Sequence, residues 1–256
     1  TIARDRAGEK PLFYMNYNNK LLFSSELKGL IVSKEIDASL NYDSMNSYLS
    51  MGFVPGDKSI LQGVNKLKPG HLLTYDCTKS LMTIKQYWSP PTPIIGKTDE
   101  RELVYELDGL LELSVHRQML ADVPVGVLLS GGVDSSLITA MAARSMNQVK
   151  TFTASFPGYK KYDESIHANL IASHFSTKHT QLEIDIDMVE PDILITLARQ
   201  FDEPICDSSM IPTYLVSKLV KQYCTVALGG DGGDELFGGY SHYSRLLWAE
   251  KKSKII

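Results

Sequence analysis

The sequence predicts an α/β protein in which a doubly wound, mainly parallel sheet follows a smaller α+β region. Candidate helices and strands alternate from residue 99 onward, whereas the earlier residues favour paired strands with a few short helices. Pro90, Pro91, Pro93 and Gly96 mark the change between the two regions. Because proline and glycine interrupt regular structure, we expect a first domain over residues 1–89, a linker over 90–98 and a second domain over 99–256.

The first region is expected to be largely antiparallel. Residues 12–26 place strand-forming side chains on both sides of Asn18-Asn19, a pair typical of a hairpin turn. Apolar spacing favours short helices over 25–32 and 44–51, the second with Tyr48 and Leu49 on its apolar side. Residues 70–75 and 82–88 complete the pattern as two strands that would pair with each other.

From residue 99 the pattern changes. Residues 99–120 show a helical apolar period with an acidic first turn, and residues 123–129 form an apolar run typical of a buried parallel strand. The expected order continues with helices over 136–145, 163–175 and 212–222, and with strands over 149–155, 179–184 and 224–228. This alternation is what predicts a doubly wound sheet.

Composition and charge exclude several classes of function. The net charge of −4 gives no reason to expect a nucleic acid as partner, because such binding uses clustered Lys and Arg. No apolar run approaches the ~20 residues that cross a bilayer, so no membrane partner is expected. Cys77, Cys206 and Cys224 lack zinc or dithiol spacing. They indicate a reducing, cytoplasmic location, with Cys206 and Cys224 as packed thiols.

The first motif with chemical content follows the apolar run that ends in Leu128-Leu129. A strand, then Ser-Gly-Gly-Val-Asp-Ser-Ser, then a helix places backbone amides at a helix N-terminus, where they can surround an anion. Gly131 and Gly132 allow close approach of a phosphate, and further donors are the hydroxyls of Ser130, Ser135 and Ser136. Asp134 would be repelled by phosphates unless a divalent cation lay between them, so it is the candidate Mg²⁺ ligand.

This motif differs from the GxxxxGK[ST] loop, since it lacks the lysine that reaches the β- and γ-phosphates. The difference favours retention of pyrophosphate over transfer of the γ-phosphoryl group. The structural alternative is a strand-to-helix turn that is rich in Gly and Ser and uses the aspartate as a helix cap.

The second motif, residues 228–240, contains glycines too frequent for a core or a helix. It also follows a predicted buried strand, so we expect its backbone to lie against a ligand at the carboxyl edge of the sheet. Asp231 and Asp234 are interpreted as site residues that hold a second metal or a substrate amine. Glu235 is equally well explained as the start of the next helix.

Taken together, the motifs of the second region resemble the synthetase domain of glutamine-hydrolysing asparagine synthetases. Their order and spacing carry the resemblance: residues 130–136, 152–156, 162–165, 202–204 with 207–209, and 230–240. The first region resembles the later half of that family's N-terminal-nucleophile glutaminase domain at residues 4–12, 24–28 and 67–71. The fold that this implies is a PP-loop ATP pyrophosphatase sheet of the adenine nucleotide α-hydrolase type, preceded by part of a glutaminase domain.

The resemblance also implies roles for single residues. Leu128 and Ala154 would contact adenosine, Gly229 and Gly230 would close over the nucleotide, and the phosphates would lie against residues 130–135. Asp231 is counted with the nucleotide-binding residues, and Asp163 would lie near the metal or aspartate. Asp134 and Asp234 are the expected catalytic and metal-binding carboxylates. Gly229 stands where relatives commonly carry Ser, so one hydroxyl contact would be missing.

The implied activity is ATP-dependent amide synthesis, in which ammonia from glutamine attacks β-aspartyl-AMP and gives asparagine, AMP and pyrophosphate. Aspartate, glutamine and ATP are then the small-molecule partners, Mg²⁺ is the cofactor, and a homodimer is left open. We expect a fragment cut at both ends, which lacks the N-terminal cysteine nucleophile and is inactive alone as a glutaminase. Two alternatives remain: amidation of another carboxylate (a sugar, a peptide or a β-lactam precursor), and nucleotide binding without catalysis.

Overall fold

The computed structural model describes residues 1–92, 96, 99–158, 163–184 and 192–253. Internal contacts divide the chain into two compact units. Unit 1 comprises Thr1–Ile95 and Glu190–Ile211, and unit 2 comprises Gly96–Val189 and Pro212–Ile256. The first crossing between the units falls in the proline-rich stretch where the sequence places a linker. The inclusion of 190–211 in unit 1 differs from the uninterrupted second domain expected over 99–256.

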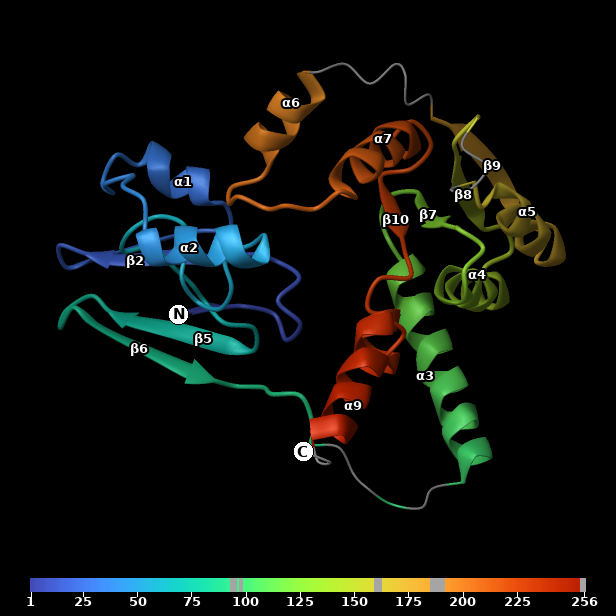
Figure 1. Ribbon diagram of the computed structural model, residues 1–256, viewed down its shortest axis with the longest axis horizontal. Coiled ribbons are helices and arrows are strands. Elements are labelled where there is room, and N and C mark those ends of the chain that lie inside the picture. Colours follow the sequence, from blue (N-terminus) through green and yellow to red (C-terminus); the bar gives the residue numbers. More distant parts are fainter. Residues whose placement is uncertain (93–95, 97–98, 159–162, 185–191, 254–256) are drawn as a thin grey trace. The chain divides into compact units, whose positions relative to one another are not determined.

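The described residues of unit 1 form two antiparallel sheets of three strands each, and β2, β5 and β6 are labelled in Figure 1. One has the order β1-β5-β6 and the other the order β3-β2-β4. Asn18 and Asn19 take positive φ angles of 49° and 58° between β2 and β3, which confirms the predicted hairpin turn. The strands are β1 (Ile2–Ala3), β2 (Phe13–Tyr17), β3 (Lys20–Ser24), β4 (Asn65–Lys66), β5 (His71–Asp76) and β6 (Leu81–Gln86).

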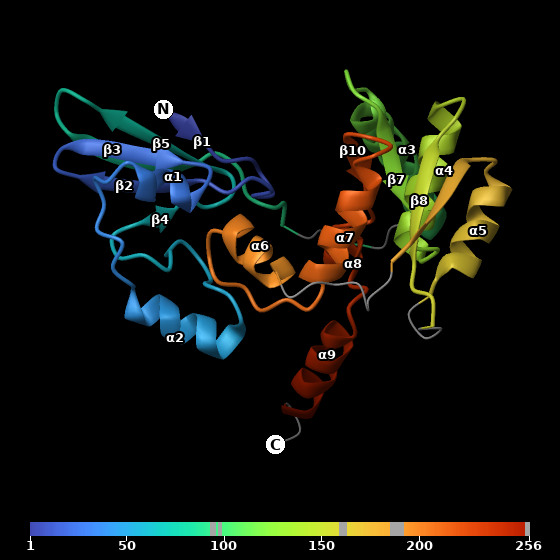
Figure 2. The same ribbon diagram turned by 90° about the horizontal axis from the view of Figure 1, so that it is seen from above.

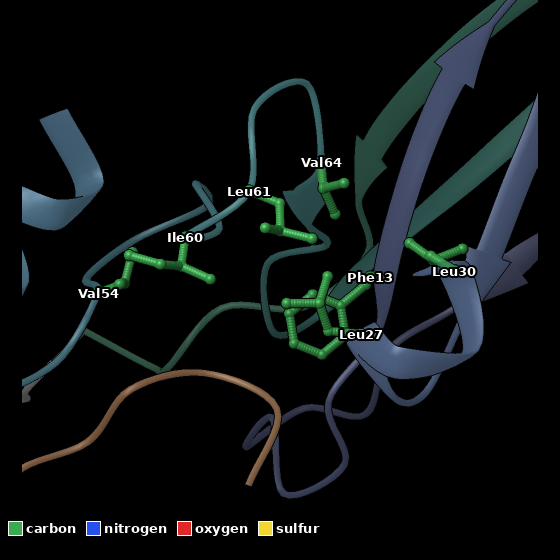
Figure 3. Packing of buried hydrophobic residues seen from close by; sticks show 7 residues of the cluster. All are labelled: Phe13, Leu27, Leu30, Val54, Ile60, Leu61 and Val64. Carbon is green, nitrogen blue, oxygen red and sulfur yellow. The ribbon is translucent and has the colours of Figure 1, made fainter. Parts of the chain in front are cut away.

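The alternation of side chains along β2 gives unit 1 two cores. Tyr14 packs with Leu67 and Leu73. Phe13 points to the other face of the sheet, where it packs under the helix α1 (Leu27–Val32). The cluster around Phe13 is drawn in Figure 3 and consists of Phe13, Leu27, Leu30, Val54, Ile60, Leu61 and Val64. Unit 1 also contains α2 (Tyr42–Met51) and α6 (Asp192–Gln200).

Unit 2 is built on a four-stranded sheet in the order β10-β7-β8-β9, and every neighbouring pair is parallel. The strands are β7 (Val125–Leu128), β8 (Lys150–Ser155), β9 (Lys178–Glu183) and β10 (Val226–Leu228). From β7 the chain adds β8 and β9 on one side of β7 and then returns to add β10 on the other side. β7 and β10 therefore lie side by side although they are far apart in sequence. This is the topological switch point at which open α/β sheets bind ligands.

Helices cover both faces of this sheet, as Figure 2 shows. On one face, α3 (Glu100–Met119) and α4 (Val133–Ser145) pack on Val127 of β7, and α5 (Ser165–His174) packs on Leu129. On the other face, α7 (Met210–Val220) places Val220 against Phe152 and Leu182. The predicted α/β class with a doubly wound parallel sheet is therefore confirmed.

The helices differ in detail from the sequence-based expectation. α4 begins at Val133 rather than at residue 136, because the Ser-Gly-Gly turn directly precedes it. No helix was expected at α6. Glu235, which was interpreted as a possible helix start, lies in the short helix α8 (Gly233–Phe237), and α9 (Ser241–Ser253) follows it. Cys224 is buried as expected, but Cys206 is exposed, so the expectation of a packed thiol at Cys206 was wrong. Within the described ranges, no helix is both long and apolar enough to cross a bilayer.

Candidate nucleotide-binding site

The turn after β7 is shaped by Gly131. Its φ angle is +84°, in the left-handed region that favours glycine. A Cβ atom at this position would lie 2.6 Å from His167 Cβ and 2.7 Å from Ala168 N, both in α5. Glycine is therefore required both for the backbone angle and for the close approach of the turn to α5.

Two serine hydroxyls hold this turn together. Ser130 N–H donates to Ser135 Oγ at 3.2 Å, and the hydroxyl oxygens of the two serines are 2.9 Å apart. Gly132 N–H donates to Ser130 Oγ at 3.3 Å. The sequence assigned these hydroxyls to a phosphate, whereas the structure shows them bonded within the turn. Their first effect is to fix the shape of the loop.

The N-terminus of α4 is thereby left with free amides. Gly132 is its N-cap and makes no side-chain capping bond. Ser136 N–H donates to Gly132 O at 3.0 Å, but within the part of the chain that the structure describes, no acceptor faces the amides of Val133, Asp134 and Ser135. Together with the helix dipole, three unpaired amides create a favourable position for an anion.

The second glycine-rich stretch lies directly against the first. A Cβ atom on Gly230 would be 2.8 Å from Asp134 Cβ and 3.1 Å from Ser135 N. A Cβ atom on Gly233 would be 2.7 Å from Asp134 Cγ. Only residues without a side chain allow the two backbones to lie this close, so the glycines expected to approach a ligand also approach Asp134.

These two stretches enclose a pocket of about 370 Å³ in unit 2. Nine of the residues predicted from the sequence line it: Leu128, Ser130, Gly132, Asp134, Ser135, Gly229, Gly230, Asp231 and Asp234. Val133, Gly232, Glu235 and Tyr240 also line it, although the sequence did not single them out as site residues. Their positions inside the two motifs were the available signal.

Four other predicted residues lie outside this lining. Gly131 shapes the turn, and Ala154 is in β8 near its carboxyl end. Ser136 Oγ is buried and has no hydrogen-bond partner among the described residues. Asp163 accepts a hydrogen bond from Ser165 N at 3.0 Å, so its carboxylate caps the start of α5. Tyr162 of the same motif is outside the described residues.

The charged side chains of the pocket are all acidic: Asp134, Asp231, Asp234 and Glu235. A polyphosphate would therefore meet favourable amides and repelling carboxylates in the same space. A divalent cation resolves this conflict, and oxygen ligands are the ones that Mg²⁺ prefers. The described residues contain no group of three or more His, Cys, Asp or Glu that could hold a metal. One or two carboxylates fit Mg²⁺ nonetheless, because it usually completes its shell with waters and substrate phosphates.

A tyrosine and a glutamate are paired at the edge of the pocket. Tyr240 Oη donates to Glu235 Oε1 at 2.7 Å. This bond raises the pKa of Tyr240 to about 12 and lowers the pKa of Glu235. The tyrosine ring stacks on His242, with centroids 5.2 Å apart. At neutral pH the pair is a fixed phenol-carboxylate contact in which the phenol carries the proton.

The parallel sheet and the pocket at its carboxyl edge define an α/β protein of the nucleotide-binding class. The asparagine synthase family model matches residues 106–256, and the glutamine amidotransferase domain model matches residues 1–88. The chain therefore belongs to the asparagine synthase family, and it carries a glutamine amidotransferase match in front of the synthase match.

Curated relatives agree with this assignment. A Methanocaldococcus jannaschii protein provisionally named asparagine synthetase (glutamine-hydrolyzing) 2 is 37% identical over 93% of this chain and 46% of its own length. Asparagine synthetase (glutamine-hydrolyzing) 1 of Bacillus subtilis is 34% identical over 96% of this chain and 38% of its own. The chain thus spans less than half the length of these relatives. Among solved structures, an NH3-dependent NAD synthetase from Campylobacter jejuni aligns over 56% of this chain and 62% of its own, with 18% identity and a TM-score of 0.35.

Proposed function

We propose that this chain belongs to a glutamine-hydrolysing asparagine synthetase and contains its nucleotide-binding pocket. The reaction converts aspartate, glutamine and ATP to asparagine, glutamate, AMP and pyrophosphate by way of β-aspartyl-AMP. The observation that carries the proposal is the meeting of the turn after β7 with the glycine-rich stretch after β10 around one pocket. The family assignment and the names of the curated relatives support it.

The pocket offers a physical route to adenylation. A carboxylate oxygen of aspartate attacks the α-phosphorus of ATP, the bond to the bridging oxygen breaks, and pyrophosphate leaves with the electron pair. The free amides of Val133, Asp134 and Ser135 would bind the leaving pyrophosphate and stabilise its charge in the transition state. Gly229 and Gly230 would allow the nucleotide to lie directly on the backbone.

Asp134 and Asp234 are the proposed ligands of Mg²⁺, and Asp231 lies on the same glycine-rich stretch as Asp234. When bound, Mg²⁺ would neutralise the charge of the pyrophosphate and make it a better leaving group. Asp134 and Asp234 would hold the cation beside the phosphates and away from the apolar side of the pocket formed by Leu128. A cytoplasmic location and self-association into a homodimer complete the proposal.

Calorimetric titration of the purified chain with MgATP tests the binding step. We expect saturable binding that weakens at least about tenfold in Asp134→Ala, because the phosphates would then lack their cation bridge. Asp37→Ala removes an exposed carboxylate of unit 1 and is the matched control. Absence of binding by the unaltered chain, or equal affinity in Asp134→Ala, would refute the proposed site.

The acceptor is tested separately, in the complete gene product. Carboxylates other than aspartate belong in the screen, because amidation of a sugar, a peptide or a β-lactam precursor is the alternative that the sequence leaves open. We expect release of pyrophosphate with aspartate and glutamine, and much less with sugar or peptide carboxylates. Release with another acceptor and none with aspartate would retain the chemistry but replace the substrate.

A further inference from the structure

Part of the segment between β9 and β10 belongs to unit 1 rather than to the unit that contains the sheet. Residues 192–209 fall within the match to the asparagine synthase family, yet α6 and the following residues pack in unit 1. We propose that Asp202 and Glu203 form a docking motif that holds this crossover on unit 1. This role lies outside the nucleotide pocket and does not depend on the proposed function.

Asp202 caps a helix from far along the chain. Its Oδ2 accepts the N–H of Leu27 at 2.6 Å across 175 residues of sequence. Leu27 is the first residue of α1, and Glu26 at the N-cap makes no side-chain capping bond of its own. A carboxylate at this position satisfies a helix amide and interacts favourably with the helix dipole. Asp202 therefore supplies the cap that the local sequence lacks.

Glu203 is bound through both oxygens. Its Oε1 accepts the N–H of Ile60 at 2.9 Å, and its Oε2 lies 2.9 Å from Lys66 Nζ. The same ammonium donates to Val54 O at 2.7 Å. The side chains of Glu203 and Lys66 are only 17% and 14% exposed. Removal of one partner would leave the other charge poorly solvated, so this contact is costly to break.

Both carboxylates bind the backbone of a single core. Leu27 and Ile60, whose amides donate to the two carboxylates, belong to the cluster drawn in Figure 3. A further bond, from Cys206 N–H to Gly52 O at 2.8 Å, extends the contact to the end of α2. The motif thus joins the crossover to residues of the cluster around Phe13.

The docked segment leads directly into the sheet. Residues 210–220 form α7, whose Val216, Leu219 and Val220 pack with Phe152 and Leu182. β10 and the glycine-rich stretch of the pocket follow. Asp202 and Glu203 therefore hold the part of the crossover that precedes α7, and none of the described residues that they bind lines the pocket.

Hydrogen exchange of the full chain, followed by mass spectrometry, tests the proposal. In Glu203→Gln we expect exchange at the Ile60 amide and across residues 192–209 to speed up at least about tenfold. Lys66→Met should speed up exchange by a similar factor. The double variant Glu203→Gln with Lys66→Met should exchange more slowly than the product of the two single effects predicts, because neither partner is left with an unpaired charge. Lys66→Arg keeps the positive charge, so it should retain most of the protection against exchange that the unaltered chain shows.

The control is a second ion pair of unit 1 with the same N–O distance. Lys20 Nζ and Glu35 Oε1 are also 2.9 Å apart, but their side chains are 57% and 41% exposed. Glu35→Gln should leave exchange at Ile60 unchanged. MgATP affinity should stay within about twofold of the unaltered value in Glu203→Gln, since the side chain does not touch the pocket. Unchanged exchange in Glu203→Gln, or a large loss of nucleotide affinity with unit 1 unaffected, would overturn the docking role.

Discussion

Asp134 and Gly230 are in direct contact: a methyl group on Gly230 would lie 2.8 Å from Asp134 Cβ. The contact joins the turn after β7 to the stretch after β10, which are neighbours in the sheet and distant in sequence. The pocket therefore exists only while these two backbones remain close.

The first prediction concerns this approach. Gly230→Ala should reduce MgATP affinity at least about tenfold, because the added methyl group would force the two walls apart. Gly109→Ala is the control, since its added methyl group in α3 meets nothing within 4 Å. We expect Gly109→Ala to bind MgATP normally and to gain about 0.5–1 kcal/mol in free energy of unfolding. Calorimetry and urea denaturation measure the two effects, and equal affinities would contradict the close approach.

The second prediction concerns Tyr240, whose pKa is raised to about 12 by its bond to Glu235. In Glu235→Gln the phenol should titrate close to the ordinary value of about 10. Because the pKa of Glu235 is lowered, its carboxylate stays ionised and accepts the bond until the pH falls through that pKa. Because the pKa of Tyr240 is raised, its phenol keeps the proton that it donates until the pH approaches 12. Ultraviolet difference titration against Tyr240→Phe isolates the signal, and an unshifted phenol in the unaltered chain would rule the bond out.

The third prediction concerns His179, whose burial lowers its pKa. Its Nδ1 lies 2.9 Å from Thr151 Oγ1, and its Nε2 has no partner among the described residues. The folded state disfavours the protonated ring, so stability is complete above the ordinary pKa of about 6.5 and is lost as the pH falls below it. Melting temperature measured from pH 7.5 to pH 5 should fall less steeply in His179→Asn. If melting temperature fell equally steeply with pH in His179→Asn and in the unaltered chain, His179 would not be the cause of the loss of stability.

The fourth prediction compares two apolar residues of unit 2. Phe152 is 2% exposed and lies in the core under α7, whereas Leu103 of α3 is 50% exposed. Phe152→Ala should cost about 3–5 kcal/mol in free energy of unfolding, since it leaves a cavity. Leu103→Ala should cost less than about 1 kcal/mol. Urea denaturation measures both, and similar losses would mean that the two environments are alike.

Local patterns were sufficient to predict much of the fold. The Asn18-Asn19 turn and the apolar run before Leu129 each express a preference of neighbouring residues. The rule that carboxyl ends of parallel strands meet at one edge also brought the two glycine-rich motifs together.

Other features depend on contacts between distant residues, which periodicity does not record. The partners of Asp202 and Glu203 lie more than a hundred residues earlier in the chain, so the packing of the crossover in unit 1 could not be read from its sequence. Leu103 keeps the helical period but is half exposed. Tyr240 enters the pocket because the short helix α8 ends at Gly238, whose φ angle is +71°.

The parallel pairing of β10 with β7 has a consequence for how the chain folds. Val226 meets Val125 only after the whole intervening chain has been arranged, and closing such a large loop is entropically unfavourable and slow. β7, β8 and β9 can associate earlier, because each is close in sequence to the next. The pocket should therefore be among the last features to form, and partly folded molecules should retain the Ser130–Ser136 turn while lacking its opposite wall.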